Sequence, residues 1–115
     1  MSLTVRIEGF PAGAAIPERF AHCAKNGSGG LKPGGNLNPA IQWENAPFDT
    51  QSFALIVVER DVPADFGPSN KSGQSIAADA PRRSFSHWLV VDIPPAIPRI
   101  EPGETPDGQI GRNDF

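Results

Sequence analysis

Apolar residues are concentrated in two stretches that have the composition of buried β-strands. Residues 53–58 are apolar without interruption and are followed by Glu59, Arg60 and Asp61. In the second stretch, His87 stands at the entry to an apolar run that ends near residue 93. Apolar, β-branched runs of this kind are typical of strands covered on both faces, so we expect both faces of the first stretch to be covered. If the two strands are antiparallel neighbours, the imidazole and the acids meet at one end of a sheet.

Three shorter segments carry weaker patterns. Residues 3–7 alternate between apolar and polar side chains, which predicts a half-buried strand. Residues 40–43, with the sequence Ala-Ile-Gln-Trp, predict another short strand. Residues 18–25 are ambiguous, because a helix there would have barely two turns between a proline and a glycine.

Long stretches without regular structure separate these elements. We expect loops over residues 26–38 and 64–83, and the second is unusually long for a connection. After residue 96, prolines and glycines prevent regular structure of any length. The 115 residues include 13 prolines and 12 glycines, which fits many turns and few helices. The predicted fold class is mainly β, in a single domain over residues 1–115.

The charge and the cysteine content narrow the classes of partner. A net charge of −3 without any cluster of Lys and Arg argues against binding to nucleic acid or to an anionic membrane surface. A single cysteine, Cys23, cannot form an internal disulfide, so nothing indicates an oxidising compartment. The N-terminus lacks the apolar core of a signal peptide, and no later run is long enough to span a bilayer. We therefore expect a cytoplasmic protein.

Three side chains carry the candidate chemistry. Glu59 and Asp61 are two residues apart in a predicted strand, so strict alternation places them on one face, at the end of an apolar stripe. Carboxylates are costly to bury alone, so a cation, a donor-rich ligand or His87 should compensate them. Two plainer alternatives stay open. The acids can simply mark the point where the strand reaches water, and His87 can be a histidine at the edge of the core that bonds a backbone carbonyl.

Other kinds of chemistry have little support in the sequence. His22 has Cys23 beside it but no partner at a metal-ligand spacing, and nothing fixes the geometry of a site made of His22, His87 and Asp61. Cys23 lacks basic neighbours and is more typical of a small buried residue than of a nucleophile. No nucleophile elbow, phosphate loop or dinucleotide motif is present. We expect no metal and no cofactor.

Three segments form motifs in a fixed order along the chain. They are Asn-Leu-Asn-Pro-Ala-Ile-Gln-Trp at 36–43, Glu-Arg-Asp-Val-Pro at 59–63 and His-Trp-Leu-Val-Val at 87–91. The first resembles the Asn-x-Ser-Pro-x-Leu-x-Trp segment of the phosphatidylethanolamine-binding protein (PEBP) family, including its bacterial Raf kinase inhibitor-like members. The other two resemble the Asp-Pro-Asp-Ala-Pro motif and the His-Trp/Phe-Leu/Val-Val-Val strand of that family. The resemblance covers nearly the whole chain from Ile16 onward.

The resemblance implies a fold and a site. The fold has a central antiparallel sheet, a smaller second sheet and few short helices, with a small pocket at one end for phosphate or phosphoryl-headgroup ligands. By position, Glu59 and Asp61 match the two acids of the motif and Pro63 its proline. His87 matches the pocket histidine, and Phe85 the aromatic residue that often stands two positions before it. Members are generally binding or inhibitory modules rather than enzymes.

The chain departs from the family pattern in two places. Glu59 and Arg60 replace the first Asp and the Pro of the acidic motif. The Gly-Pro-x-x-Pro segment and the His-Arg-Tyr strand of the family are absent, and residues 111–115 resemble the part just before them. The resemblance therefore implies that the C-terminal portion of the fold is missing or is supplied by a second polypeptide.

Three functions are compatible with these observations. The leading one is a module that binds small phosphate or phosphoryl-headgroup anions, such as a phospholipid headgroup, and that inhibits a kinase or a protease. In it, His87 and backbone N–H groups contact the anion, and Glu59 or Asp61 orients the imidazole. The second is a metal-assisted or acid–base hydrolase that uses His87, His22 and Asp61. The third is an interaction module that pairs an open sheet edge with a second copy, as a homodimer, or with a complementing C-terminal chain.

Overall fold

A computed structural model describes residues 2–67 and 74–115, and these residues form three antiparallel sheets with almost no helix. One three-stranded sheet has the order β1-β4-β7, with β1 at Thr4–Ile7, β4 at Ile41–Glu44 and β7 at Arg99–Ile100. The other has the order β5-β6-β8, with β5 at Phe53–Pro63, β6 at Arg82–Ile93 and β8 at Gln109–Ile110. A two-stranded sheet consists of β2 at Cys23–Lys25 and β3 at Leu31–Pro33. The mainly β fold class is confirmed.

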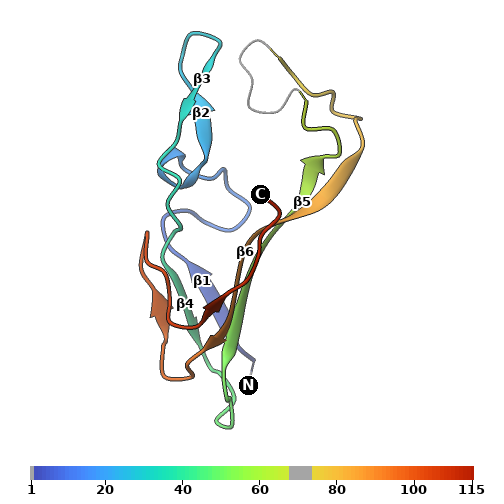
Figure 1. Ribbon diagram of the computed structural model, residues 1–115. Coiled ribbons are helices and arrows are strands. Elements are labelled where there is room, and N and C mark those ends of the chain that lie inside the picture. Colours follow the sequence, from blue (N-terminus) through green and yellow to red (C-terminus); the bar gives the residue numbers. More distant parts are fainter. Residues whose placement is uncertain (1, 68–73) are drawn as a thin grey trace.

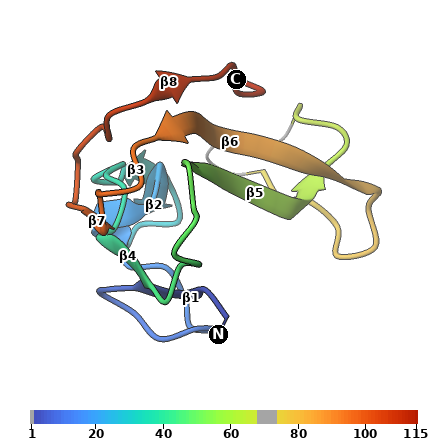
Figure 2. The same cartoon turned by 90° about the horizontal axis from the view of Figure 1, so that it is seen from below.

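The pair of long strands β5 and β6 dominates the shape of the molecule. The molecule is elongated, with extents of 51 × 26 × 25 Å. Figure 1 shows β5 and β6 along one side, with the β1-β4-β7 sheet and the β2-β3 hairpin on the other. In Figure 2, β8 lies beside β6 on the edge away from β5. Because β6 is the central strand of its sheet, side chains from both neighbouring segments can gather around it.

The core connects the two three-stranded sheets. Val90 and Ile93 of β6 and Ile100 of β7 are the largest side chains that are fully buried. The rings of Trp43 on β4 and Phe53 on β5 make a further contact between the sheets, with centroids 5.4 Å apart. The apolar run of β6 therefore contributes to the buried core, as its composition predicts. Burial of such side chains is the main stabilising term of a small domain.

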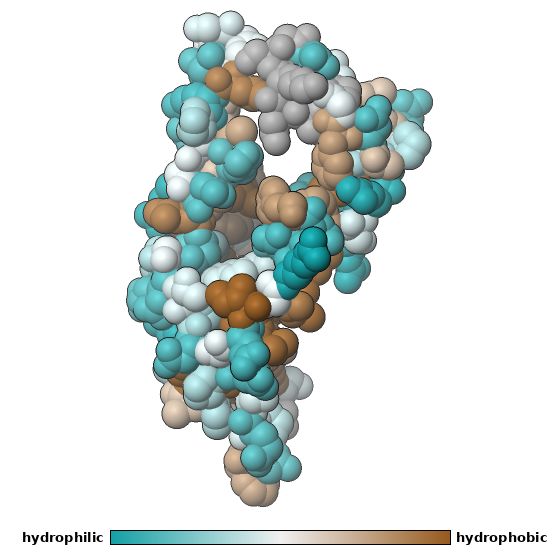
Figure 3. Space-filling model, in the orientation of Figure 1, coloured by the Kyte–Doolittle hydropathy of each residue, from teal (hydrophilic) through white to brown (hydrophobic). Residues whose placement is uncertain are grey.

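The expectation that β5 is covered on both faces is wrong for the described part of the chain. Ile56 is 60% exposed and Val58 is 46% exposed. Figure 3 shows apolar atoms at the surface along the β5–β6 side of the molecule. The reason is topological: β5 is the outermost strand of its sheet, and no other described strand packs on the face that carries these two side chains.

The segment around residues 18–38 differs from the prediction. Residues 18–25, which the sequence left ambiguous, form one 3-10 turn at Glu18–Phe20 followed by β2. The predicted loop 26–38 contains β3, which pairs with β2. A Cβ atom on Gly35 would lie 2.2 Å from the carbonyl oxygen of Arg19, so only glycine lets the chain pass this close to the turn.

The boundaries of the other elements differ by a few residues. β1 and β4 confirm the two predicted short strands. β6 begins at Arg82, within the predicted loop 64–83, whereas β5 ends at Pro63, just before that loop. Part of that loop, residues 68–73, lies outside the described residues. β7 and β8 occur after residue 96, where no regular structure was expected. A two-residue strand shows no periodicity, and these two exist because they pair with β4 and β6.

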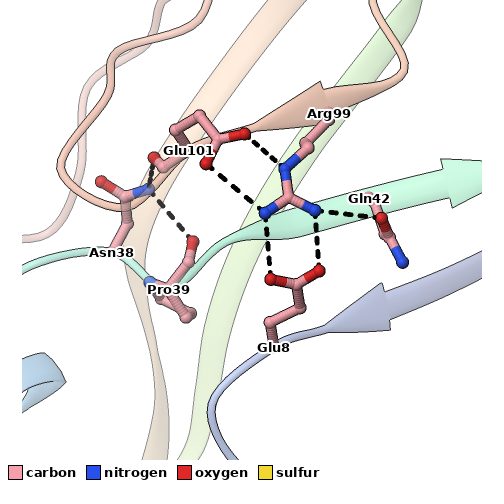
Figure 4. Close-up of polar contacts among 6 residues, drawn as sticks. All are labelled: Glu8, Asn38, Pro39, Gln42, Arg99 and Glu101. Atoms are coloured by element: carbon pink, nitrogen blue, oxygen red, sulfur yellow. Dashed lines mark hydrogen bonds and ion pairs between the residues drawn. The ribbon is translucent and has the colours of Figure 1, made fainter.

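One arginine ties the strands of the β1-β4-β7 sheet together, as Figure 4 shows. The two terminal nitrogens of Arg99 lie 2.7 and 2.9 Å from the carboxylate oxygens of Glu8, and its Nε bonds Glu101. Gln42 accepts a further hydrogen bond from Arg99 at 3.1 Å. The hydrogen bond from Arg99 lowers the pKa of Glu8, and the bonds to Glu8 and Glu101 raise the pKa of Arg99. This arrangement lies in a different sheet from the predicted site residues.

Candidate functional site

His87 occupies an irregular position in the pairing of β5 with β6. Val57 pairs with Trp88 and Val58 pairs with Ser86, so His87 is an extra residue on β6. Such a bulge interrupts the alternation of side chains and often redirects a residue beside a functional site. The ring of His87 lies against the ring of Phe85, with centroids 4.9 Å apart. This ring contact places both predicted residues on one side of the sheet.

Glu59 is the acid that meets the histidine. Its Oε2 atom lies 3.1 Å from Nε2 of His87, across the β5–β6 pairing. Glu59 is opposite Phe85 in the register, which accounts for the shared side. The side chains are 36% exposed for His87 and 51% exposed for Glu59. The antiparallel pairing therefore brings the imidazole and one acid together at the surface, as the sequence predicted, and a ligand can reach both.

Asp61 is not brought to His87. The pairs Glu59–Phe85 and Val62–Arg83 leave Arg60 and Asp61 opposite a single residue of β6. This extra residue breaks the alternation, so the expectation that Glu59 and Asp61 share one face is wrong. Within the described residues, the hydrogen bonds and ion pairs include none to the Asp61 side chain, although its carbonyl oxygen accepts a bond from a neighbouring arginine at 3.4 Å.

A cluster of aromatic rings lies on one side of the histidine. Phe85 is buried, with 7% of its surface exposed. It receives edge-on contacts from Phe66, at 5.8 Å between centroids, and from Phe115, at 4.9 Å. Phe115 also contacts His87 at 5.5 Å. These geometries are the ones that aromatic pairs prefer, so the rings form a defined apolar wall beside the His87–Glu59 pair.

The sequence did not identify Phe66 and Phe115 as site residues. Phe66 is the one aromatic residue in the sequence of the segment 64–83, and this was the available signal. Phe115 gives no comparable signal, because its position depends on the segment that precedes it.

Residues 111–115 run along the outer edge of β6 and hold Phe115 in place. The amide of Asp114 donates to the carbonyl oxygen of Ser86 at 3.0 Å, and the amide of Ser86 donates to Oδ2 of Asp114 at 2.7 Å. Asn113 donates through Nδ2 to the carbonyl oxygen of His87 at 3.3 Å. β5 and this segment thus flank the histidine from opposite edges of β6.

Pro63 lies further along the β5–β6 pair, opposite Arg82. It borders a separate cavity of about 360 Å³, whose described lining also includes Ala64, Asp65, Ser75, Ile76, Ala77, Ala80 and Pro81. Of the five predicted site residues, the structure therefore gathers Glu59, Phe85 and His87 and leaves Asp61 and Pro63 apart from them.

The second histidine is not part of this cluster. His22 lies just before β2, and within the described residues no hydrogen bond, ion pair or ring contact joins it to His87 or Asp61. No three His, Cys, Asp or Glu side chains in residues 2–67 and 74–115 are placed to hold a metal ion together. In the same residues, no helix has the length and apolar character needed to cross a membrane.

Comparison with known proteins decides the family. The profile of the family described as phosphatidylethanolamine-binding protein matches residues 6–115. The chain belongs to this family. Its resemblance to PEBP motifs at 36–43, 59–63 and 87–91 is thereby confirmed.

Two relatives show how much of a family member the chain represents. It is 38% identical over 97 residues to a UPF0098 protein of Aquifex aeolicus, which covers 81% of this chain and 46% of that protein. It is 31% identical over 90 residues to the UPF0098 protein YbcL of Escherichia coli, which covers 71% of this chain and 40% of that protein. The chain thus spans about half the length of the curated relatives it matches. No solved structure gives a significant match.

Proposed function

We propose that this PEBP-family chain binds small anions that carry a phosphate or phosphoryl headgroup, at the surface formed by Glu59, Phe85 and His87. The observation that carries the proposal is the His87–Glu59 contact of 3.1 Å on a half-buried bulge. By accepting from Nε2, Glu59 orients the ring, and the other ring nitrogen has no partner among the described residues. Membership in a family described as phosphatidylethanolamine-binding supports a phosphoryl headgroup as the ligand class.

The proposal extends to residues and partners that the geometry supports less directly. Asp61 and Pro63 match the family's acidic motif, so we include them as secondary contributors to ligand affinity. A role in inhibiting a kinase or a protease, exercised in the cytoplasm by binding rather than by catalysis, belongs to the same proposal. It rests on the family resemblance alone.

Calorimetric titration tests the binding proposal. Inorganic phosphate and phosphoethanolamine are titrated separately into the protein, into His87→Gln and into a matched control, His22→Gln. Binding by the wild type and the control, with loss in His87→Gln, supports the proposal. Binding that survives in His87→Gln contradicts the site, and the absence of binding to the wild type at millimolar ligand contradicts the function.

A second candidate function is strand pairing with another polypeptide. The observation that favours it is the open edge of β5, with Ile56 and Val58 exposed at the surface. Unpaired edges with apolar side chains are templates for β-strand addition. The occupant would be a second copy or a complementing C-terminal chain. Light scattering at rising protein concentration tests the first case, because a strict monomer at every concentration contradicts the homodimer.

A further inference from the structure

The His87–Glu59 pair lacks a net positive charge that could attract an anion. If the imidazole is protonated, the carboxylate of Glu59 at 3.1 Å neutralises it. If the imidazole is neutral, the pair carries one negative charge. With a protonated imidazole, the pair has no net charge and gives a phosphoryl group no net attraction. With a neutral imidazole, the carboxylate of Glu59 repels it. Another cation on the same side of the sheet would therefore strengthen the binding proposed above.

Arg83 is placed to supply that charge. It lies two residues before Phe85 on β6 and pairs with Val62, so its side chain faces the same side as Phe85. Its guanidinium carbon lies 4.8 Å from the centre of the Phe66 ring, and Phe66 in turn contacts Phe85. A continuous set of ring contacts thus leads from Arg83 through Phe66 and Phe85 to His87.

The guanidinium of Arg83 is available for a ligand. The ion pairs found in the described residues do not include Arg83, whereas Arg6 and Arg99 are both bound to carboxylates. The contact with the Phe66 ring is a cation–π contact, and the hydrogen bonds found in the described residues include none from the N–H donors of Arg83. These donors match two oxygens of a phosphoryl group, so the contact can be bidentate.

We propose that Arg83 is the cationic anchor of the site. Its guanidinium binds the phosphoryl oxygens, and the rest of the ligand lies over the Phe66–Phe85 wall toward His87 and Glu59. Charge complementarity then favours a phosphoryl compound whose other end donates hydrogen bonds or carries a positive charge, because that end meets the Glu59 carboxylate. This inference rests on the proposed function and names the residue that gives the site its charge.

Two substitutions with the same change of charge test the inference. Arg83→Gln removes the anchor. Arg60→Gln is the matched control, because Arg60 lies in the bulge of β5 opposite Ser84 and not on the Phe85 side of the sheet. Both are titrated with inorganic phosphate and with phosphoethanolamine, and the amide NMR spectra establish that both variants are folded. Arg83→Lys, which keeps the charge but loses the fork of donors, completes the set.

The expected result is a dissociation constant about 10 to 100 times higher for Arg83→Gln, which is the effect of losing a hydrogen bond to a charged group. Arg60→Gln should stay within about twofold of the wild type, and Arg83→Lys should recover part of the loss. If the wild type binds and folded Arg83→Gln binds equally well, the anchor is refuted while the proposed function stands. If the wild type binds neither anion, the proposed function fails and this inference with it.

Discussion

The imidazole of His87 and the carboxylate of Glu59 meet across two antiparallel strands, with Nε2 and Oε2 3.1 Å apart. A carboxylate can only accept at this contact, so a neutral His87 carries its proton on Nε2 and leaves Nδ1 as an acceptor. The contact also identifies Glu59, rather than Asp61, as the acid that orients the ring. Both consequences can be measured separately from ligand binding.

Replacing Glu59 should release the His87 tautomer. In the wild type at a pH where the ring is neutral, the long-range ¹H–¹⁵N spectrum should show His87 almost entirely as the Nε2–H form. Glu59→Ala should increase the share of the Nδ1–H form and move the nitrogen shifts toward averaged values, because the partner that holds the proton on Nε2 is lost. The control Asp61→Ala should leave the His87 signals unchanged. If the His87 signals change as much in Asp61→Ala as in Glu59→Ala, the assignment of the orienting role to Glu59 is contradicted.

Two isoleucines on adjacent strands should differ sharply in their contribution to stability. Ile93 is 1% exposed and Ile56 is 60% exposed. Ile93→Ala should lower the free energy of unfolding by about 2–5 kcal/mol, because it removes buried surface and leaves a cavity. Ile56→Ala should cost less than about 1 kcal/mol. Urea denaturation measures both. Equal costs would mean that another strand or another copy of the chain covers β5 in solution.

Arg99 should make the stability of the protein depend on pH on the acid side. Its hydrogen bond lowers the pKa of Glu8 in the folded state below the ordinary value of 4.5. The resulting stabilisation is present above that ordinary value and is lost as the pH falls through the lowered pKa. Arg99→Gln should therefore lower Tm at pH 7, and the difference from the wild type should shrink in strongly acidic buffer.

The control for this prediction is Arg6→Gln. Arg6 forms a single exposed ion pair with Glu44, with side chains 63% and 54% exposed, and exposed pairs of this kind contribute little. Thermal unfolding followed by circular dichroism at several pH values gives the comparison. A difference between Arg99→Gln and the wild type that is the same at pH 3 as at pH 7 would contradict the assigned role of Glu8.

Asp114 should protect the amide of Ser86 from solvent exchange. The Ser86 N–H donates to Oδ2 of Asp114 at 2.7 Å. In Asp114→Ala this partner is lost, so the Ser86 amide should exchange about 10 times faster, the effect expected for a bond worth about 1–2 kcal/mol. Asp107→Ala is the control and should leave this rate unchanged. An unchanged rate in Asp114→Ala would mean that the 111–115 segment does not hold Phe115 against His87.

The sequence predicted the principal elements because their physical cause is local. The alternation of residues 3–7 and the apolar runs before Glu59 and after His87 reveal β1, β5 and β6 directly. The sequence did not predict four short strands, β2, β3, β7 and β8. Each of them forms by pairing with another strand, and a pairing of this kind leaves no periodic pattern in the sequence. The apolar composition of β5 likewise predicted a cover that the described part of the chain does not supply.

The site was predicted only in part, because some of its residues lie in local motifs and others depend on pairing between distant segments. Motif positions identified Glu59, Phe85 and His87, and the antiparallel register brings them together. The three irregular points of that register could not be predicted, and one of them separates Asp61 from Glu59. Phe115 and Asn113 reach His87 only through the tertiary pairing of the 111–115 segment with β6, to which their own sequence gives no guide.

The central claim is that a phosphoryl compound binds at the surface formed by Glu59, Phe85 and His87, and the imidazole reports on it most directly. The measurement is a phosphoethanolamine titration followed by the ¹H and ¹⁵N signals of the His87 ring, with His22 as the internal reference. The account predicts saturable shifts at His87, accompanied by shifts at the Phe85 and Arg83 amides, and none at His22. Signals of His87 that do not move, or that move no more than those of His22, would contradict it.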